Sequence, residues 1–427
     1  MGAAEPNPVP SRTGAVPEES VKATDSAPTT IAPARVTGRL SASDLAKFKA
    51  KAGDEIRQYA SIYGISDDVA ADWMRIEVEL TGEGQKFKNS LANYSGFRLR
   101  STPDGPRGVL AIAGAPPKID NPKIEIVKSR LSAVDLAKLH TASSKIPPFR
   151  DGVVIGNVRL QAVSYDPFDD NFITHYLSIN DSAKNGVRLG TPSENIRSIA
   201  RSLAAKAGLK EGEEMLERVV EGPAHLSSGG LTVTTNSSFF WGFYTESLSK
   251  CTTGFGVYSP QGNWDYTTAA HCQSAGVNNV NSFPIYSIHS RRIGGYQDVM
   301  MLRGNGAYWT TQTNPGVFED MDSDIGHIFQ GTYYCNYGMK TAARQCSVVA
   351  SVNQPVPGQG TTIFTSKSFT SRCRGGDSGG PVWQPAFPES KPAGMIDAAF
   401  QLAPDGSGYC GFVALDDQLN GTGWVLL

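Results

Sequence analysis

The chain of 427 residues is 40% hydrophobic and 19% charged, and its formal net charge at pH 7 is −2. This length exceeds one typical domain, so two or three domains with a sizeable core are expected. A net charge near zero provides no excess of positive charge that would attract nucleic acid or a membrane surface, so neither partner is expected.

Cysteine is confined to the C-terminal half of the chain. An even number of cysteines in one region is typical of a disulfide framework formed in an oxidising compartment, and no C-x-x-C spacing suggests a metal site. We therefore expect disulfides, an exported protein and neither a metal nor another cofactor. Spacing alone leaves fifteen pairings open. The six residues are Cys251, Cys272, Cys335, Cys346, Cys373 and Cys410.

The first 38 residues are rich in Pro, Ala, Ser and Thr and have scarcely any large apolar side chains. Such a composition cannot offset the entropy of ordering the chain, so residues 1–38 are predicted to be disordered. They contain no basic segment followed by an apolar core, and no later stretch reaches the length of a transmembrane helix. For an exported protein, we expect that a signal segment was removed or that the start is misassigned.

Two helices are predicted next. Apolar residues recur at helical spacing over 40–62, Ser43 can cap the start, and Gly64 ends the pattern. A second pattern of the same period covers 66–80.

Strand signals follow the helices. The runs 97–100 and 109–113 flank the turn signal Pro-Asp-Gly-Pro, which predicts a hairpin. Further strand-like runs occupy 153–165 and 172–179, and another helical pattern covers 193–207. Together, residues 39–225 are predicted to form an α+β region without cysteine.

One nine-residue string occurs twice in this region. RLSASDLAK at 39–47 and RLSAVDLAK at 130–138 differ at one position. The pair indicates either a duplicated helical unit or two helix starts that use the same Ser and Asp capping chemistry, and both interpretations stay open.

After the linker Leu-Ser-Ser-Gly-Gly at 226–230, the sequence changes to short runs of Val, Thr, Tyr and Phe separated by Gly, Asn and Pro. This texture is typical of all-β structure. Residues 226–427 are enough for two small barrels with filled interiors, so a separate all-β domain is predicted here.

A candidate nucleophile lies in the string Gly-Gly-Asp-Ser-Gly-Gly-Pro, as Ser378. Glycines allow a strained turn that points N–H groups at a reacting carbonyl. The string also fits the nucleophile elbow of α/β-hydrolases, but an elbow serine needs a later histidine, and none of the six histidines follows Ser378. The base must come from upstream, in the order His, Asp, Ser.

The base candidate is His271, in Thr-Thr-Ala-Ala-His-Cys. A disulfide at the next residue could hold its backbone rigid, and small alanines before it allow tight packing, as the orientation of a general base requires. His289 and His327 are the alternatives, but neither has a comparable setting.

Three strings in this order, Cys-Thr-Thr-Gly-Phe at 251–255, TTAAHC and GGDSGGP, resemble the bacterial secreted trypsin-like serine proteases of the streptogrisin and α-lytic protease group. The resemblance covers about 230–427. It implies two six-stranded antiparallel β-barrels with the active site between them, and hydrolysis of peptide bonds. It also implies the sequential pairings Cys251–Cys272, Cys335–Cys346 and Cys373–Cys410.

The resemblance further implies an acid between the base and the nucleophile. Asp298 precedes an apolar run, as the family's acid does, whereas Asp320, Asp322 and Asp324 lie in an acidic, loop-like segment. An acid that orients an imidazole needs apolar surroundings, which favours Asp298. The backbone N–H groups of Gly376 and Ser378 would then form the oxyanion hole.

Two positions depart from the family's pattern. Asn336 stands where the family has an arginine that pairs with the acid before the nucleophile, so Asp377 needs another partner, Arg374 or Lys340. Asp397 stands near Gly394, where the family has a Ser-Gly-Gly wall of the substrate cleft. Like charges resist joint ionisation, so altered substrate binding is expected there.

The sequence therefore predicts a secreted serine endopeptidase that acts through an acyl-enzyme on protein or peptide substrates. It is expected to be made as a proenzyme, with residues 39–225 as its pro-region and a partner of its own protease domain. The alternative from another class is a protease-fold binding or scaffold protein with lost or weak turnover, suggested by Asn336 and Asp397.

Overall fold

The structure is a computed structural model that describes the chain in segments. These are residues 40–136, 153–155, 158–168, 171–178, 218–221, 251–262, 264–270, 272, 279–280, 283–284, 287–294, 297–303, 310–315, 317–356, 361–366, 372–400 and 408–426. The predicted helix at 193–207, the predicted disorder of 1–38 and the linker at 226–230 lie outside the described residues. The boundaries 1–38, 39–225 and 226–427 therefore stay a prediction.

Two helices open the described chain, α1 (Ala42–Tyr63) and α2 (Asp67–Ser90). The cap of α1 is Ser41 rather than Ser43: its hydroxyl accepts the N–H of Asp44 at 3.1 Å. Gly64 ends the helix in the left-handed conformation, as predicted, with φ of 66°. The same chemistry recurs in the second copy of the repeated string, where Ser132 accepts the N–H of Asp135 at 3.3 Å.

The second helix runs ten residues beyond its predicted end at Leu80. Leu80, Gly84 and Phe87 follow one another at helical spacing and are all buried. A β-carbon at Gly84 would lie 2.5 Å from the ring of Phe97, so glycine lets this helix approach the next strand closely. The helix continues because of tertiary packing, which overrides the poor helix propensity of glycine.

Two small sheets complete the N-terminal region. Strands β1 (Tyr94–Thr102) and β2 (Gly105–Ala113) form the predicted antiparallel hairpin, and β3 (Ile124–Ser129) pairs with β2 in parallel. In the second sheet, the run predicted as one strand at 153–165 is divided into two antiparallel strands, β4 and β5, and the run predicted at 172–179 forms β6, which pairs with β5. The order in this sheet is β4 (Val153–Ile155), β5 (Val158–Asp166), β6 (Asn171–Ser178) and β7 (Arg218–Glu221).

The C-terminal region is built from antiparallel strands, and its first sheet has five strands among the described residues. Their order is β12 (Ser287–Gly294), β13 (Gln297–Arg303), β9 (Trp264–Thr268), β8 (Gly256–Tyr258) and β23 (Val425–Leu426). Two short hairpins accompany it, β10 (Asn279–Val280) with β11 (Phe283–Pro284), and β14 (Thr310–Asn314) with β15 (Val317–Asp320).

The second C-terminal sheet closes into a barrel, because its first strand β18 also pairs with β22. This barrel is called the second barrel below. The order around this barrel is β18 (Thr361–Ser366), β17 (Ala343–Val356), β16 (Tyr333–Gly338), β20 (Pro381–Gln384), β21 (Lys391–Phe400) and β22 (Gly408–Ala414), and β19 (Arg372–Cys373) adds to β22. A short helix, α6 (Leu415–Leu419), follows the last barrel strand. The all-β fold class of this region is confirmed, with six strands in the second barrel.

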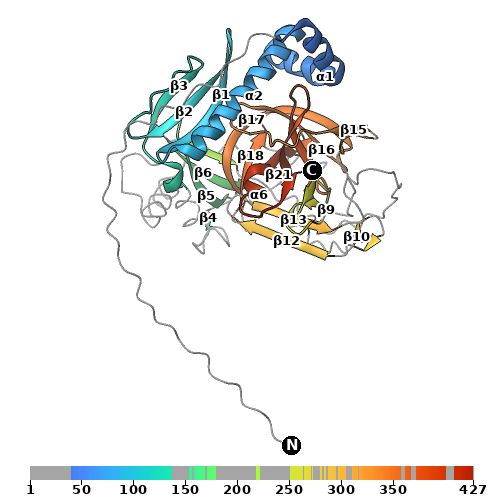
Figure 1. The fold of residues 1–427 in the computed structure, drawn as a ribbon. Helices are drawn as coiled ribbons and strands as arrows, with labels where there is room; N and C mark the ends of the chain where they lie inside the picture. The colour runs from blue at the N-terminus through green and yellow to red at the C-terminus, as the bar shows by residue number, and fades with distance from the viewer. Residues whose placement is uncertain are drawn as a thin grey trace, which may run out of the picture.

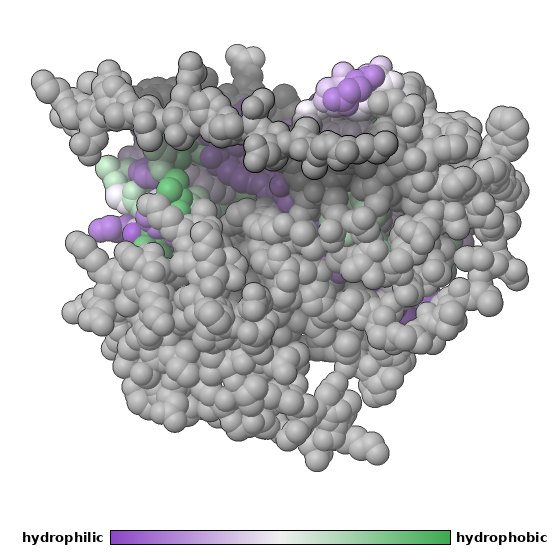
Figure 2. Space-filling view, turned by 90° about the horizontal axis from the view of Figure 1, so that it is seen from below, coloured by the Kyte–Doolittle hydropathy of each residue, from purple (hydrophilic) through white to green (hydrophobic). Residues whose placement is uncertain are grey.

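All three expected disulfides are present, with the sequential pairing that the resemblance implied, and no cysteine is free. Among the described helices, none combines the length and apolar character needed to cross a membrane. On the face seen in Figure 2, the described residues show hydrophobic and hydrophilic side chains next to each other.

The two N-terminal helices pack on the outside of the second barrel. In Figure 1 they lie over β16 and β17, at the opposite end of the molecule from β12. Helix and barrel side chains form one hydrophobic cluster, so the two regions share a core. Its members are Phe48, Ala52, Ile56, Tyr59, Ala60, Ala70, Ala71 and Met74 on the helical side, and Met321, Tyr333, Cys335, Tyr337, Cys346 and Trp383 on the other.

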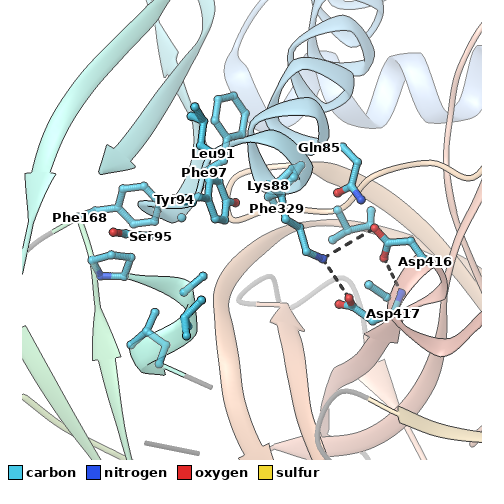
Figure 3. Close-up of a pocket in the computed structure, with 18 residues that line it drawn as sticks. Gln85, Lys88, Leu91, Tyr94, Ser95, Phe97, Phe168, Phe329, Asp416 and Asp417 are labelled. Atoms are coloured by element: carbon cyan, nitrogen blue, oxygen red, sulfur yellow. Dashed lines mark hydrogen bonds and ion pairs between the residues drawn. The ribbon is translucent and has the colours of Figure 1, made fainter. Parts of the chain in front are cut away.

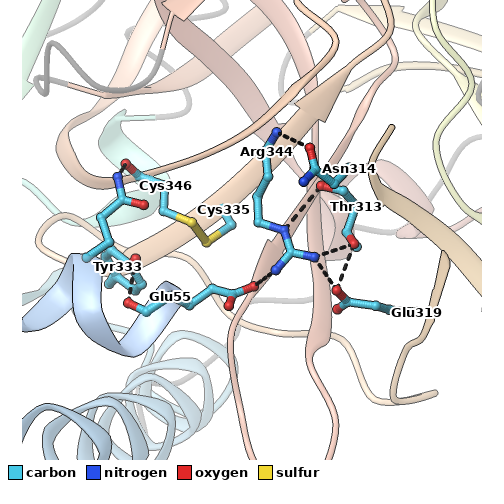
Figure 4. Close-up of a disulfide and its surroundings, with 9 residues drawn as sticks. Glu55, Thr313, Asn314, Glu319, Tyr333, Cys335, Arg344 and Cys346 are labelled. Atoms are coloured by element: carbon cyan, nitrogen blue, oxygen red, sulfur yellow. Dashed lines mark hydrogen bonds and ion pairs between the residues drawn. A yellow bond between two sulfur atoms is a disulfide. The ribbon is translucent and has the colours of Figure 1, made fainter. Parts of the chain in front are cut away.

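Polar contacts fix the register of this interface beside the Cys335–Cys346 disulfide (Figure 4). The guanidinium of Arg344 pairs with the carboxylates of Glu55 from α1 and Glu319 from β15. Burial raises the pKa of Glu55, and the charge of Arg344 opposes that rise. A buried pair is costly to break because one charge is then left alone, so the network specifies how α1 sits on the barrel.

Candidate active site

The turn that carries Ser378 is shaped by its own backbone hydrogen bonds. The N–H of Asp377 donates to the carbonyl of Arg374 at 3.0 Å, and the N–H of Gly380 donates to the carbonyl of Asp377 at 2.9 Å. Gly376 has φ of 109°, a value that side chains rarely permit. Within the described part of the chain, the N–H groups of Gly376 and Ser378 make no hydrogen bond. The two donors predicted for an oxyanion hole are therefore not used inside this turn.

Gly379 is required by close packing as well as by its backbone angle, with φ of 86°. A β-carbon there would lie 2.2 Å from the carbonyl oxygen of Thr252 and 2.3 Å from the hydroxyl of Thr268. The N–H of Thr252 in turn donates to the carbonyl of Ser378 at 2.7 Å. The nucleophile turn is thus packed directly against residues 252 and 268 of the first C-terminal sheet region.

Asp377 has partners that replace the arginine absent at Asn336. Its carboxylate accepts the backbone N–H groups of Lys340 and Thr341, both at 2.9 Å, and of Arg374 at 2.8 Å, and the Thr341 hydroxyl also donates to it. Burial raises the pKa of this carboxyl, and these hydrogen bonds act to lower it. The expectation that Arg374 or Lys340 would serve is confirmed, but through backbone N–H groups. Thr341 was missed, and no local signal marks it.

Ser378 lies beside strand β21. Its side chain is buried, and its hydroxyl oxygen is 3.5 Å from the backbone carbonyl of Asp397. The N–H of Gly379 donates to the carbonyl of Ile396 at 2.7 Å, which ties the turn to the strand one residue earlier. The pairing of β21 with β22 slips between Ile396 and Ala398, so Asp397 is the extra residue of a bulge. The side chain of Asp397 is fully buried, and it is the backbone carbonyl of this residue that lies next to the nucleophile.

His271 lies outside the described residues, and its neighbours are Ala270 and Cys272, both fully buried. The disulfide from Cys272 to Cys251 holds this segment next to Thr252. Thr268, at the end of β9, donates its hydroxyl to the carbonyl of Thr252 at 2.8 Å. Thr252 therefore links the segment that carries His271 to the turn that carries Ser378. In the sequence, Thr252 was marked only by its position in the string Cys-Thr-Thr-Gly-Phe.

Asp298 is fully buried near the start of β13. The strand pairs with β9, with Met300 opposite Thr268. Continuing that antiparallel register by two residues brings Asp298 level with Ala270, the residue before His271. The backbone of Asp298 is held by the side chain of Gln418, whose oxygen accepts the Asp298 N–H at 2.9 Å. Sequence reasoning missed Gln418.

The alternative residues have other surroundings. Asp320 and Asp324 are exposed, and Asp322 is 3.0 Å from the ammonium group of Lys391. His327 is 3.7 Å from a carboxylate oxygen of Asp416, on α6. The His289 side chain lies outside the described residues. Of the four acids considered, only Asp298 is fully buried, as an orienting acid requires.

A cavity of about 400 Å³ lies between the N-terminal region and the second barrel, away from the nucleophile turn (Figure 3). Aromatic side chains such as Tyr94, Phe97 and Phe329 line one part of it. At the other end, Lys88 from α2 reaches Asp417 at 2.9 Å and Asp416 at 3.9 Å. Burial raises the pKa of Asp417, and the charge of Lys88 opposes that rise.

In the described part of the chain, no cluster of His, Cys, Asp and Glu is arranged to hold a metal ion.

No family model matches the chain, and no curated protein matches it. Thermobifida fusca protease A is 20% identical, with 42% of this chain and 91% of that chain covered and a TM-score of 0.32. Cellulomonas bogoriensis chymotrypsin is 18% identical, with 42% and 91% covered and a TM-score of 0.32. A glutamic-acid-specific serine protease is 19% identical, with 42% and 93% covered and a TM-score of 0.31.

Proposed function

We propose that this protein is an exported serine endopeptidase that hydrolyses peptide bonds through an acyl-enzyme on Ser378. The observation that carries the proposal is the turn around Ser378. It buries the Ser378 hydroxyl, and the N–H groups of Gly376 and Ser378 make no hydrogen bond to the described residues, while those of Asp377, Gly379 and Gly380 donate to backbone carbonyls. Donors aimed at a developing oxyanion are the largest single contribution in acyl transfer.

In the proposed reaction, His271 accepts the proton of the Ser378 hydroxyl as the oxygen attacks the substrate carbonyl carbon. The N–H groups of Gly376 and Ser378 hold the resulting oxyanion. The imidazolium then gives its proton to the leaving amine as the C–N bond breaks, and a water molecule repeats the sequence to release the acid. Asp298 orients the imidazole and stabilises its charged form.

The proenzyme part of the proposal rests on the packing of the N-terminal region. α1 and α2 share a core with β16, β17 and β20, and the Glu55–Arg344 pair lies at the same contact. Strand β20 directly follows the nucleophile turn, so what packs on it can act on the turn. We propose that residues 39–225 dock here as a pro-region before they are cut away.

A fluorophosphonate label, which reacts with activated serine hydroxyls, tests the function. The protein should be labelled after cleavage between the N-terminal region and the protease domain, and Ser378→Ala should abolish the label. Ser347→Ala is the matched control, since Ser347 is equally buried on β17, far from the turn in sequence. A cleaved, folded protein that neither takes the label nor cleaves any member of a peptide library would favour the alternative, a protease-fold binding protein.

A further inference from the structure

Gln418, on α6, uses its side-chain amide as a clamp on the backbone of Asp298. Its oxygen accepts the Asp298 N–H at 2.9 Å, and its nitrogen lies 3.5 Å from the Asp298 carbonyl oxygen. Both side chains are fully buried. An amide that meets one N–H and one C=O offers the same two groups as the peptide of a neighbouring strand.

This clamp lies where a strand ladder has ended. β9 pairs with β13 only from Arg303 to Met300, and the pairing stops before Asp298. A buried N–H at such a point needs an acceptor, and Gln418 supplies it from 120 residues away in sequence. On its other side β13 pairs with β12, where Ile293 lies opposite Asp298. On the β9 side, the backbone N–H of Asp298 is therefore held by a side chain instead of by a strand.

The contact is reciprocal, because Gln297 binds the helix that carries Gln418. The Gln297 amide nitrogen donates to the backbone carbonyls of Asp417, Gln418 and Asn420 at 3.0 to 3.2 Å. These carbonyls lie at the C-terminal end of α6, where carbonyls lack partners within a helix. Leu415 and Leu419 of the same helix pack with β13 side chains in one hydrophobic cluster. Neither β13 nor α6 can shift alone.

We infer that Gln418 is a positioning residue for the proposed triad, which fixes the backbone of Asp298 so that its carboxylate meets the imidazole of His271. The inference rests on the proposed function. A carboxylate that moves by about 1 Å costs up to about 100-fold in rate, because catalytic groups act only within a narrow geometry. It also stabilises the imidazolium less, which lowers the pKa of the imidazole.

The test compares Gln418→Met with Gln384→Met in the cleaved protein. Gln384 is the control, as a glutamine on β20 that contacts Thr81 of α2 rather than Asp298. In the cleaved protein, which has lost α2, its replacement by Met leaves the support of Asp298 intact. Gln418→Met should lower kcat by about 10- to 100-fold with KM within about threefold, and should move the acid limb of the kcat–pH profile to lower pH. Gln384→Met should leave that limb in place.

Two further variants keep the inference falsifiable if Gln418→Met does not fold. Gln418→Glu keeps an acceptor for the Asp298 N–H and should recover most of kcat, while Gln297→Met should lower kcat and move the acid limb as Gln418→Met does. A folded Gln418→Met with wild-type kcat and an unmoved limb would overturn the inference, as would the same losses in Gln384→Met.

A failure of the proposed function is distinguishable from a failure of this inference. If the wild type has no activity, the imidazole pKa of His271, followed by NMR, still reports on the clamp. A lower imidazole pKa in Gln418→Met, approaching that of Asp298→Asn, supports the positioning role without turnover. An imidazole pKa unchanged by Gln418→Met but lowered by Asp298→Asn refutes it.

Discussion

The buried carboxylate of Glu77, on α2, accepts the backbone N–H of Tyr333, on β16, at 3.1 Å, and the hydroxyl of Tyr59 at 2.6 Å. The contact joins the N-terminal region to the second barrel through a group that titrates. Burial raises the pKa of Glu77 to about 7, although both hydrogen bonds act to lower it. The interface therefore prefers Glu77 protonated.

This preference predicts a pH dependence of stability. An acid whose pKa is higher in the folded state stabilises that state fully below its ordinary pKa of 4.5, and this contribution is lost as the pH rises through about 7. The shift corresponds to about 3 kcal/mol. In Glu77→Gln, which cannot ionise, thermal unfolding of the uncut chain should weaken less between pH 5 and pH 8 than in the wild type.

Some dependence should remain in that variant, because burial also raises the pKa of Glu55 at the same interface. The control is Glu125→Gln, which removes an exposed partner of Arg100 and should not change the slope. Equal slopes of Tm against pH in Glu77→Gln and the wild type would contradict the prediction.

Gly379 should be irreplaceable for two reasons that can be separated. Alanine at this position would have to adopt a positive φ, and its β-carbon would lie 2.2 Å from the Thr252 carbonyl oxygen. Gly64 has a positive φ too, but nothing lies within 4 Å of its β-carbon position. Gly64→Ala should cost about 1 kcal/mol, and Gly379→Ala at least 3 kcal/mol. Urea unfolding of the two variants measures the difference, and similar costs would count against tight packing of the turn.

The triad prediction concerns how losses combine. If His271 and Ser378 act as one unit, each single change to alanine should lower kcat by about 10⁴-fold or more, and the double change should be scarcely worse than either. Single-turnover rates on one peptide substrate, with folding checked by circular dichroism, measure this. Losses that multiply in the double variant would mean that the two residues act independently.

Local chemistry made parts of this structure predictable. Gly64 ends α1 because the backbone there needs a left-handed residue. The Pro-Asp-Gly-Pro turn between β1 and β2 is predictable for a similar reason, because Gly105 has a positive φ. The cap of α1 was misplaced by two residues because Ser41 and Ser43 offer the same hydroxyl. α2 was predicted too short, because the ring of Phe97, for which Gly84 makes room, lies on a later strand.

The polar supports of the site depend on contacts distant in sequence, and local patterns do not contain them. Thr341 donates to Asp377 from 36 residues away, and Gln418 reaches Asp298 across 120. A glutamine next to two aspartates on a short helix is typical of a solvated surface. Only the folded chain shows that this one is buried against a strand end.

The last prediction is that residues 40–225 assist the folding of 226–427 and inhibit its activity when added in trans. An all-β double barrel has many strand pairings between residues distant in sequence. Each pairing costs loop-closure entropy before its contacts form, so folding without assistance is expected to be slow. α1 and α2 pack on β16, β17 and β20 in one core, so they can stabilise those pairings as they form.

The experiment refolds 226–427 with and without 40–225 and follows peptide cleavage over time. Ile56→Glu in the added region should abolish the assistance, because Ile56 is buried in the shared core, whereas Ile62→Glu on the exposed face of the same helix should retain it. If 226–427 refolds alone to full activity at the same rate, and 40–225 does not inhibit it, residues 40–225 are instead an independent domain that stays attached.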